Sequence, residues 1–198
     1  MSDEGLSRRG ATARKRLLAA AHTELSETGE LEVAAVARRA GVSVGLPYRY
    51  FGSRSGLLTA VIADFYDRLD ETVTYAEFPG NDWRAREHAR VVAWVNFLYD
   101  DPLAPVALGR FGDAETAGVE RQRLQQAIEV GARNMAQGQQ QGMVPADRDP
   151  ELLVAAVLGG VHMAVAVALT RNPRPDRTRV ADQVWQFVAG ATGFQEEQ

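Results

Sequence analysis

The sequence predicts an all-α protein of about nine helices, with an N-terminal helix-turn-helix unit followed by a larger helical body. Three observations favour this class. Apolar residues recur at three- and four-residue spacing through most of the 198 residues. No segment shows the apolar–polar alternation of a half-buried strand, and no internal repeat occurs. Glycine and proline clusters divide the chain into segments of helical length.

Three short helices around one apolar centre are predicted in the first quarter of the chain. Residues 1–10 are polar and are expected to be disordered. The helices should span about 11–26, 32–40 and 44–51, and a glycine follows each of them, at positions 29, 41 and 52. This unit is too small to be very stable alone, so it should pack against the helices that follow.

The remaining helices are bounded by capping and breaking residues. A long helix of about 53–75, with Ser53 as its cap, would join the two parts of the chain. Phe78-Pro79-Gly80-Asn81 ends this connection, and Asp82 can cap the next helix. The later segments run from Trp83 to Asp101-Pro102, through a short piece ending near Arg110, and then over about 113–141, 150–170 and 176–194.

The composition is that of an ordinary globular protein, with 45% hydrophobic and 24% charged residues. The absence of cysteine excludes disulfides, thiolate metal sites and a cysteine nucleophile. Residues 1–16 are polar and Arg-rich, unlike a signal peptide. Glycines and a histidine interrupt the longest apolar run, 152–169, which favours a buried helix over a membrane span. We therefore expect a cytoplasmic protein with no membrane partner.

Charge is distributed unevenly along the chain. The formal net charge is −4, which by itself argues against a nucleic-acid partner. Residues 1–55, however, hold nine Lys and Arg against six Asp and Glu, whereas the remainder holds thirteen against twenty. A basic head on an acidic body is the distribution expected of a DNA-binding protein, although the excess is modest.

The segment GVSVGLPYRYF, which starts at Gly41, has the pattern of a helix-turn-helix. Gly41 follows the last apolar position of the second helix, where glycine can take the left-handed conformation that closes a helix. Ser43 is a preferred N-cap residue for the next helix. Tyr48 can donate to a DNA phosphate, and Arg49 and Arg54 can each neutralise one. The predicted DNA-binding residues are Ser43, Val44, Gly45, Tyr48, Arg49 and Arg54.

These residues resemble the DNA-binding domain of the TetR (tetracycline repressor) family of bacterial regulators. The family's turn corresponds to Ala40-Gly41-Val42-Ser43, and the end of its recognition helix corresponds to Tyr48-Arg49-Tyr50-Phe51. The basic residue and the leucine pair that follow in the family correspond to Arg54 and Leu57-Leu58. The similarity covers roughly residues 14–61. It implies a DNA-binding domain over residues 1–52 and a ligand-sensing and dimerisation domain over residues 53–198.

Three positions depart from the family pattern. Val44 stands where family members often carry a basic or polar residue, so a base contact there would be apolar, for instance to a thymine methyl group. Pro47 removes an N–H early in the recognition helix, which is tolerable in or near its first turn. Glu32 stands where the family usually has a Thr or Ser touching a phosphate, and a carboxylate would instead repel DNA.

The helix predicted over 150–170 is nearly apolar all round, so most of its sides must be covered. The last helix alone cannot easily cover it. We therefore expect a homodimer in which the last two helices pair with their symmetry mates, as the resemblance also implies. The predicted interface residues are Leu153, Val157, Gly160, Val184, Trp185 and Val188. Such a dimer would read a palindromic operator in double-stranded DNA, with half-sites roughly 34–36 Å apart.

The resemblance further implies a small-molecule pocket among the body helices. The candidates are Tyr66, Trp94, Phe97, Phe111, Met135, His162 and Met163, although each is also explained as an ordinary core residue. This set is aromatic- and Met-rich with few charges, which suits an apolar or aromatic effector. Asn96 and His162 can supply orienting hydrogen bonds. Effector binding would re-space the two heads, so that the protein acts as a ligand-released repressor.

Two alternatives belong to other classes. An enzyme is disfavoured because His22, His88 and His162 fall on different predicted helices and no HExxH, GxSxG or P-loop motif occurs. The sequence thus predicts no catalytic residue, cofactor or metal site. The second alternative is a dimeric helix-turn-helix DNA-binding protein without small-molecule sensing, which acts through a protein partner or architecturally.

Overall fold

A computed structural model of the chain describes the backbone of residues 3–110 and 112–193 and, within those ranges, the side chains from residue 10 onward. These residues form α-helices and one π-helical turn with no strand, which confirms the predicted all-α class. The elements are α1 (Asp3–Thr28), α2 (Val33–Ala40), α3 (Gly45–Phe51), α4 (Arg54–Leu69), the π-helical turn η1 (Asp70–Thr74), α5 (Trp83–Asp100), α6 (Ala104–Gly109), α7 (Ala117–Gln140), α8 (Pro150–Thr170) and α9 (Arg177–Ala191).

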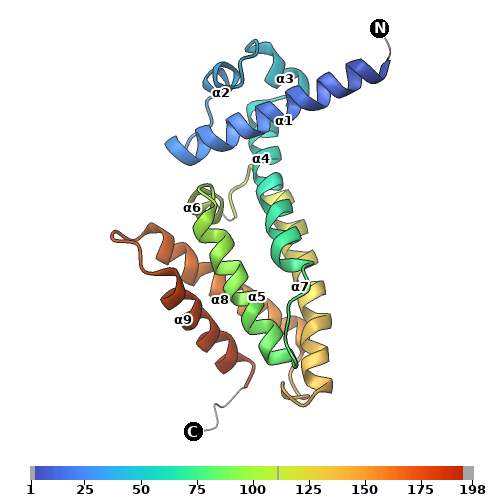
Figure 1. Ribbon diagram of the computed structural model, residues 1–198, viewed down its shortest axis with the longest axis vertical. Helices are drawn as coiled ribbons and strands as arrows, with labels where there is room; N and C mark the ends of the chain where they lie inside the picture. Colours follow the sequence, from blue (N-terminus) through green and yellow to red (C-terminus); the bar gives the residue numbers. More distant parts are fainter. Residues whose placement is uncertain (1–2, 111, 194–198) are drawn as a thin grey trace.

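Helices α1 to α3 form a head, which lies at the top in Figure 1. Helix α4 runs from the head down into the body, where it lies beside α7. Helices α8 and α9 lie side by side, and α9 also packs along α5. The head therefore reaches the body through α4 and through the contacts of α1.

Two predicted boundaries differ from the structure. Residues 3–10 were expected to be disordered, but α1 already begins at Asp3. Residues 3–10 contain no proline, so no residue in this stretch prevents helical backbone. The single helix predicted over 53–75 is α4 followed by η1, because the hydrogen-bond pattern widens from Asp70.

The starts of four helices are fixed by side-chain caps. Ser53, Asp82, Asp149 and Asp176 stand immediately before α4, α5, α8 and α9. Their oxygens accept hydrogen bonds from free N–H groups of the first turn at 2.8 to 3.1 Å. Each cap satisfies donors that the helix itself cannot pair. The sequence predicted the first two caps and the start of α8 and α9 correctly.

The head and the body share one apolar core. Leu17 of α1 belongs to the same buried cluster as Leu57 and Phe65 of α4 and Val165 of α8. A second, smaller cluster contains Trp83, Met135, Val144 and Val154. Because α4 packs against both the head and the body, its residues serve both parts of the protein.

Helix α8 is the most apolar helix of the chain. It alone among the described helices has the length and composition to cross a membrane, with a mean hydropathy of 2.4 over its most apolar stretch, only 28% of which is buried. This is weak evidence for a membrane span, since a core helix of a soluble protein meets the same criteria. The exposed apolar residues of α8 lie beside α9.

Candidate functional site

The turn between α2 and α3 has the geometry of a helix-turn-helix. Gly41 adopts φ 64° and ψ 43°, in the left-handed region, where a residue with a Cβ would be strained. The N–H of Val42 then bonds to the Ala37 carbonyl at 3.0 Å and closes α2. Ser43 does not cap α3 through its side chain. The N-cap position is Val44, and Leu46 N–H bonds to the Ser43 backbone carbonyl at 3.0 Å.

Helix α3 presents one side to solvent and the other to the core. The exposed residues are Ser43, Val44, Gly45, Tyr48 and Arg49, with Val44 53% and Tyr48 48% exposed. Val42, Leu46, Tyr50 and Phe51 pack against the core, and Pro47 is buried. These five exposed residues all belong to the set predicted to bind DNA, and their DNA contacts remain predictions.

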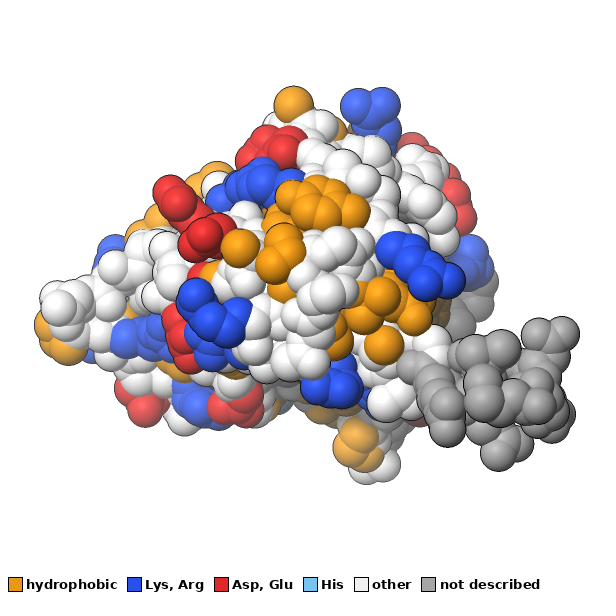
Figure 2. All heavy atoms as spheres, turned by 90° about the horizontal axis from the view of Figure 1, so that it is seen from above, with side chains coloured by type: hydrophobic (Ala, Val, Ile, Leu, Met, Phe, Trp, Pro, Cys, Tyr) orange, Lys and Arg blue, Asp and Glu red, His pale blue; other side chains and the backbone are white. Residues whose placement is uncertain are grey.

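Helix α1 supports α3 and the turn with basic side chains. The Arg14 guanidinium lies 5.4 Å from the centre of the Phe51 ring, within the range of a cation–π contact. Arg16 donates to the carbonyl of Ala40, the last residue of α2. Seen from above the head, Lys and Arg side chains are spread over the surface, with hydrophobic side chains and several Asp and Glu side chains between them (Figure 2). Such a mixture of charges and apolar groups suits a nucleic-acid backbone and its base edges.

Arg54 is exposed, but its side chain is tied to two other parts of the chain. Its Nε donates to the Leu31 carbonyl at 3.1 Å, and its Nη1 lies 3.4 Å from each carboxylate oxygen of Glu115. This pair could not be predicted, because Glu115 lies 61 positions further along in a segment without helical periodicity. A DNA phosphate that contacts Arg54 would compete with Glu115 for the guanidinium.

Glu32 stands at the N-cap of α2 and its side chain makes no capping hydrogen bond. An exposed carboxylate at that helix end would repel a neighbouring DNA phosphate. We expect Glu32→Gln to tighten DNA binding about threefold per protomer, as measured by fluorescence anisotropy on a labelled duplex. Glu30→Gln, two residues earlier, is the matched control. An equal gain in both variants would mean that only net charge matters.

The structure scatters the predicted ligand-binding residues. Met163 is 63% exposed on α8, and Met135 belongs to the small cluster around Trp83. Trp94 and Phe97 are half-buried on α5. Phe111 lies outside the described residues. The predicted set therefore does not line one site within the described chain.

Tyr66 and His162 do share a polar neighbourhood. The Tyr66 hydroxyl is buried and has no hydrogen-bond partner among the described residues, and its pKa is raised by burial and by Glu120 and Asp70. Burial lowers the pKa of His162, against the opposing effects of a Leu108 backbone hydrogen bond and of Glu120. Glu120 is 4% exposed. This cluster between α4, α7 and α8 can orient a polar group of a ligand.

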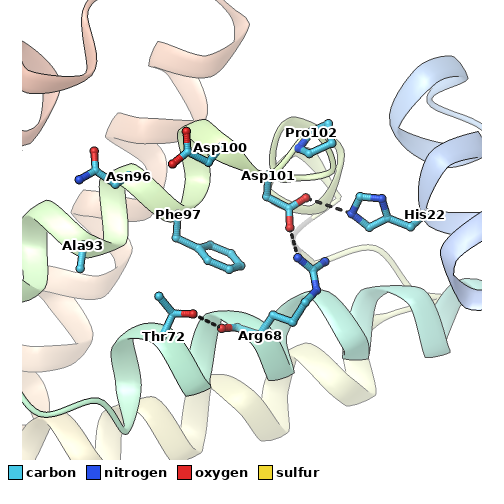
Figure 3. Close-up of a pocket in the computed structure, with 9 residues that line it drawn as sticks. All are labelled: His22, Arg68, Thr72, Ala93, Asn96, Phe97, Asp100, Asp101 and Pro102. Carbon is cyan, nitrogen blue, oxygen red and sulfur yellow. Dashed lines mark hydrogen bonds and ion pairs between the residues drawn. The ribbon is translucent and has the colours of Figure 1, made fainter. Parts of the chain in front are cut away.

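A groove of about 560 Å³ opens between α4 and α5 and ends at α1 (Figure 3). It is lined by His22, Arg68, Thr72, Ala93, Asn96, Phe97, Asp100, Asp101 and Pro102. The Phe97 ring points across the groove toward α4, and Arg68 and Asp101 meet at one end. Of the predicted ligand-orienting residues, Asn96 lies here.

Asp101 joins three parts of the chain at the end of this groove. Its carboxylate accepts from His22 Nε2 of α1 at 3.1 Å, from the Leu103 N–H at 2.9 Å, and from Arg68 of α4. Burial alone would raise the pKa of Asp101, but these hydrogen bonds outweigh it and lower the pKa to about 2. Because the carboxylate is ionised, His22 Nε2 carries the proton between them.

Three of the residues predicted for the dimer interface lie on the inward side of α9. Val184, Trp185 and Val188 are 3%, 8% and 6% exposed, because they pack into the chain's own core along α5. Leu153 and Val157 are partly buried, and a Cβ on Gly160 would lie 2.5 Å from the Phe187 ring of the same chain. Gly160 thus permits a close approach of α8 to its own α9.

Other apolar side chains of α8 and α9 are exposed, on the side of each helix that faces away from the core. Leu152 is 73%, Met163 63% and Val167 44% exposed on α8, and Phe187 is 46% exposed on α9. Ala156 and Gly159 lie at the same helical spacing and are also exposed. These residues, which we call the α8–α9 face, form an apolar strip that no other part of the described chain covers.

Metal binding has no candidate in the structure: across the ranges described, no group of three or more His, Asp or Glu side chains is placed to hold an ion.

Comparison with known proteins identifies close relatives. Residues 17–61 match the tetR family of bacterial regulatory proteins. The HTH-type transcriptional repressor KstR of Rhodococcus jostii is 32% identical over 180 residues, which cover 86% of this chain and 78% of KstR. KstR of Mycolicibacterium smegmatis is 34% identical over 110 residues, a match that spans 53% of this chain and 54% of that protein.

Solved structures show the same fold over nearly the whole chain. The fatty acid degradation regulator FadR of Bacillus halodurans has a TM-score of 0.73 at 19% identity, with 92% of this chain and 100% of that chain covered. FadR of Bacillus subtilis, solved in complex with stearoyl-CoA, has a TM-score of 0.72 at 16% identity and the same coverage. These structures share the fold, and the KstR relationship together with the family match shows that the chain belongs to the TetR family of DNA-binding transcriptional regulators.

Proposed function

We propose that the protein is a ligand-responsive repressor, which binds a palindromic operator as a homodimer and is released by a small apolar or aromatic effector. The observation that carries this proposal is the exposed side of α3. It presents Val44, Gly45 and Tyr48 at one end of a head whose other side is packed on the core. Repression is favoured because the KstR relatives are repressors.

Dimerisation is supported by the α8–α9 face. The exposed residues of α8 follow one side of a single helix, and Phe187 extends that side onto α9. Burying such a strip against a second copy removes apolar surface from water, at roughly 25 cal/mol per Å². A two-fold dimer would also present two copies of the head, which is the symmetry that a palindromic site needs.

An apolar or aromatic effector is supported by two places in the body. The groove between α4 and α5 carries the Phe97 ring with Ala93 and Pro102. The Tyr66 hydroxyl is a buried donor that a ligand oxygen can satisfy. Both places adjoin α4, the helix that joins the body to the head, so occupation of either can bias the position of the head.

The alternative is a dimeric DNA-binding protein without an effector. Selection of duplexes from a random pool by the purified chain at about 150 mM salt tests the DNA-binding part of the proposal. A recovered palindrome is expected, and recovery of no preferred sequence would favour an architectural protein. Compounds that raise the melting temperature and release the selected duplex would establish the sensor. A library in which no stabilising compound also releases DNA would favour the version without sensing.

A further inference from the structure

Arg54 and Glu115 form an ion pair between the start of α4 and the body. Glu115 lies in the segment between α6 and α7, and both of its carboxylate oxygens are 3.4 Å from Arg54 Nη1. The side chains of Arg54 and Glu115 are 45% and 37% exposed, so solvent and other ions can reach the pair. A carboxylate and a DNA phosphate both offer anionic oxygens to a guanidinium, which makes them competitors for Arg54.

Glu115 is positioned by more than its charge. The Ser55 hydroxyl donates to Glu115 Oε1 at 2.6 Å, and the Thr59 hydroxyl donates to the Glu115 backbone carbonyl at 3.3 Å. The hydrogen bond from Ser55 and the nearby Arg54 hold the pKa of Glu115 below its usual range, so the group is ionised at neutral pH. Three residues in the first turns of α4 therefore contact Glu115, which lies in the body.

The rest of the junction does not depend on this pair. Arg110, at the end of α6, donates to the Gly29 carbonyl at 3.0 Å, and Asp101 holds His22 of α1. Arg54 Nε has its own partner in the Leu31 carbonyl at 3.1 Å. Glu115 can therefore leave Arg54 while the head stays attached to the body.

We propose that Glu115 occupies the place of a DNA phosphate on Arg54 in the free protein, and that DNA binding exchanges one for the other. This inference rests on the proposed function and adds a means of regulation to it. Glu115 lies two residues before α7, which begins at Ala117. A shift of α7 on effector binding moves Glu115 toward or away from Arg54 and so sets the strength of the competition.

The test is a double-mutant cycle on the full chain. Equilibrium binding to a labelled duplex, the palindrome recovered by selection, is measured between about 50 and 200 mM salt for wild type, Glu115→Gln, Arg54→Ala and the double variant. We expect Glu115→Gln to tighten binding about threefold per protomer, or about tenfold for a dimer, given the modest strength of exposed ion pairs. Arg54→Ala should weaken binding and lower the salt slope by about one per protomer.

The double variant decides the result. If Glu115 acts through Arg54, the double variant binds no more tightly than Arg54→Ala alone. A gain that persists without Arg54, or no gain in Glu115→Gln itself, would overturn the inference. Glu129→Gln on α7 removes the same charge away from Arg54 and should change affinity less than twofold. Failure of the wild-type chain to bind any duplex would instead contradict the proposed function.

Discussion

Met163→Glu should convert the proposed dimer to a monomer and weaken binding to the proposed operator about a hundredfold or more. Met163 is 63% exposed in the single chain and lies near the middle of the α8–α9 face, so a dimer that uses this face would bury the new carboxylate. An unpaired buried charge is among the most costly changes that an interface can receive. A monomer contacts one half-site and loses the gain in affinity that comes from linking two.

Sedimentation equilibrium at micromolar concentration, together with duplex binding, measures both effects. Leu124→Glu is the matched control, because it makes the same kind of change at an exposed apolar residue of α7. It should remain dimeric, and circular dichroism of both variants should match wild type because neither residue is in the core. A dimeric Met163→Glu protein would place the interface elsewhere.

Asp101→Asn should lower the free energy of unfolding by about 3 kcal/mol at neutral pH. Asp101 is 7% exposed, and its carboxylate accepts from His22, Arg68 and the Leu103 N–H. The side-chain amide of Asn has one oxygen acceptor and one NH₂ donor, so its NH₂ group would face one of the donors that now bond to the carboxylate. Arg68 would also lose its buried anionic partner. Losing one partner of a buried ion pair typically costs a few kcal/mol. Urea denaturation measures the change.

The pH dependence of the same variant gives a second test. The pKa of Asp101 is lowered from 3.8 to about 2 in the folded protein, so its contribution is present above about pH 4. That contribution, on the order of 2 kcal/mol, is lost as the pH falls through 2. The difference in stability between wild type and Asp101→Asn should therefore shrink between pH 4 and 2.

Asp100→Asn provides the control for both measurements. Asp100 is the preceding residue, its side chain is 64% exposed, and it pairs with Arg177 at 2.7 Å. An exposed pair of this kind contributes little to stability, so the substitution should cost less than about 1 kcal/mol. If Asp101→Asn costs no more than Asp100→Asn, the junction at Asp101 does not stabilise the fold.

The helices and the DNA-binding turn could be predicted because their signals are local. Gly41, Ser53 and Asp82 act on residues within one turn of themselves, so their effect can be read from the sequence. The faces of α9 were harder to assign. Val184 and Phe187 are three positions apart and both apolar, and only the position of α5 decides which one is buried.

The polar contacts at the junction could not be predicted at all. His22 and Asp101 are 79 positions apart, and Arg54 and Glu115 are 61 apart. No periodicity links such residues, because their meeting depends on how the head rests on the body. The same limit explains why the predicted ligand-binding residues were scattered. They were chosen for their chemistry, and the packing of α4, α5 and α8 separates them.

The core that the head shares with the body restricts where recombination can replace the DNA-binding head by that of a relative. Leu17 of α1, Phe65 of α4 and Val165 of α8 belong to one buried cluster, which the start of α4 crosses. Recombination at residue 52 would join a new head to an α4 surface shaped for the old one. A viable crossover has to carry the α1-facing side of α4 along with the head. Substitutions on the exposed side of α3 leave this shared core intact, whereas transfer of a whole head does not.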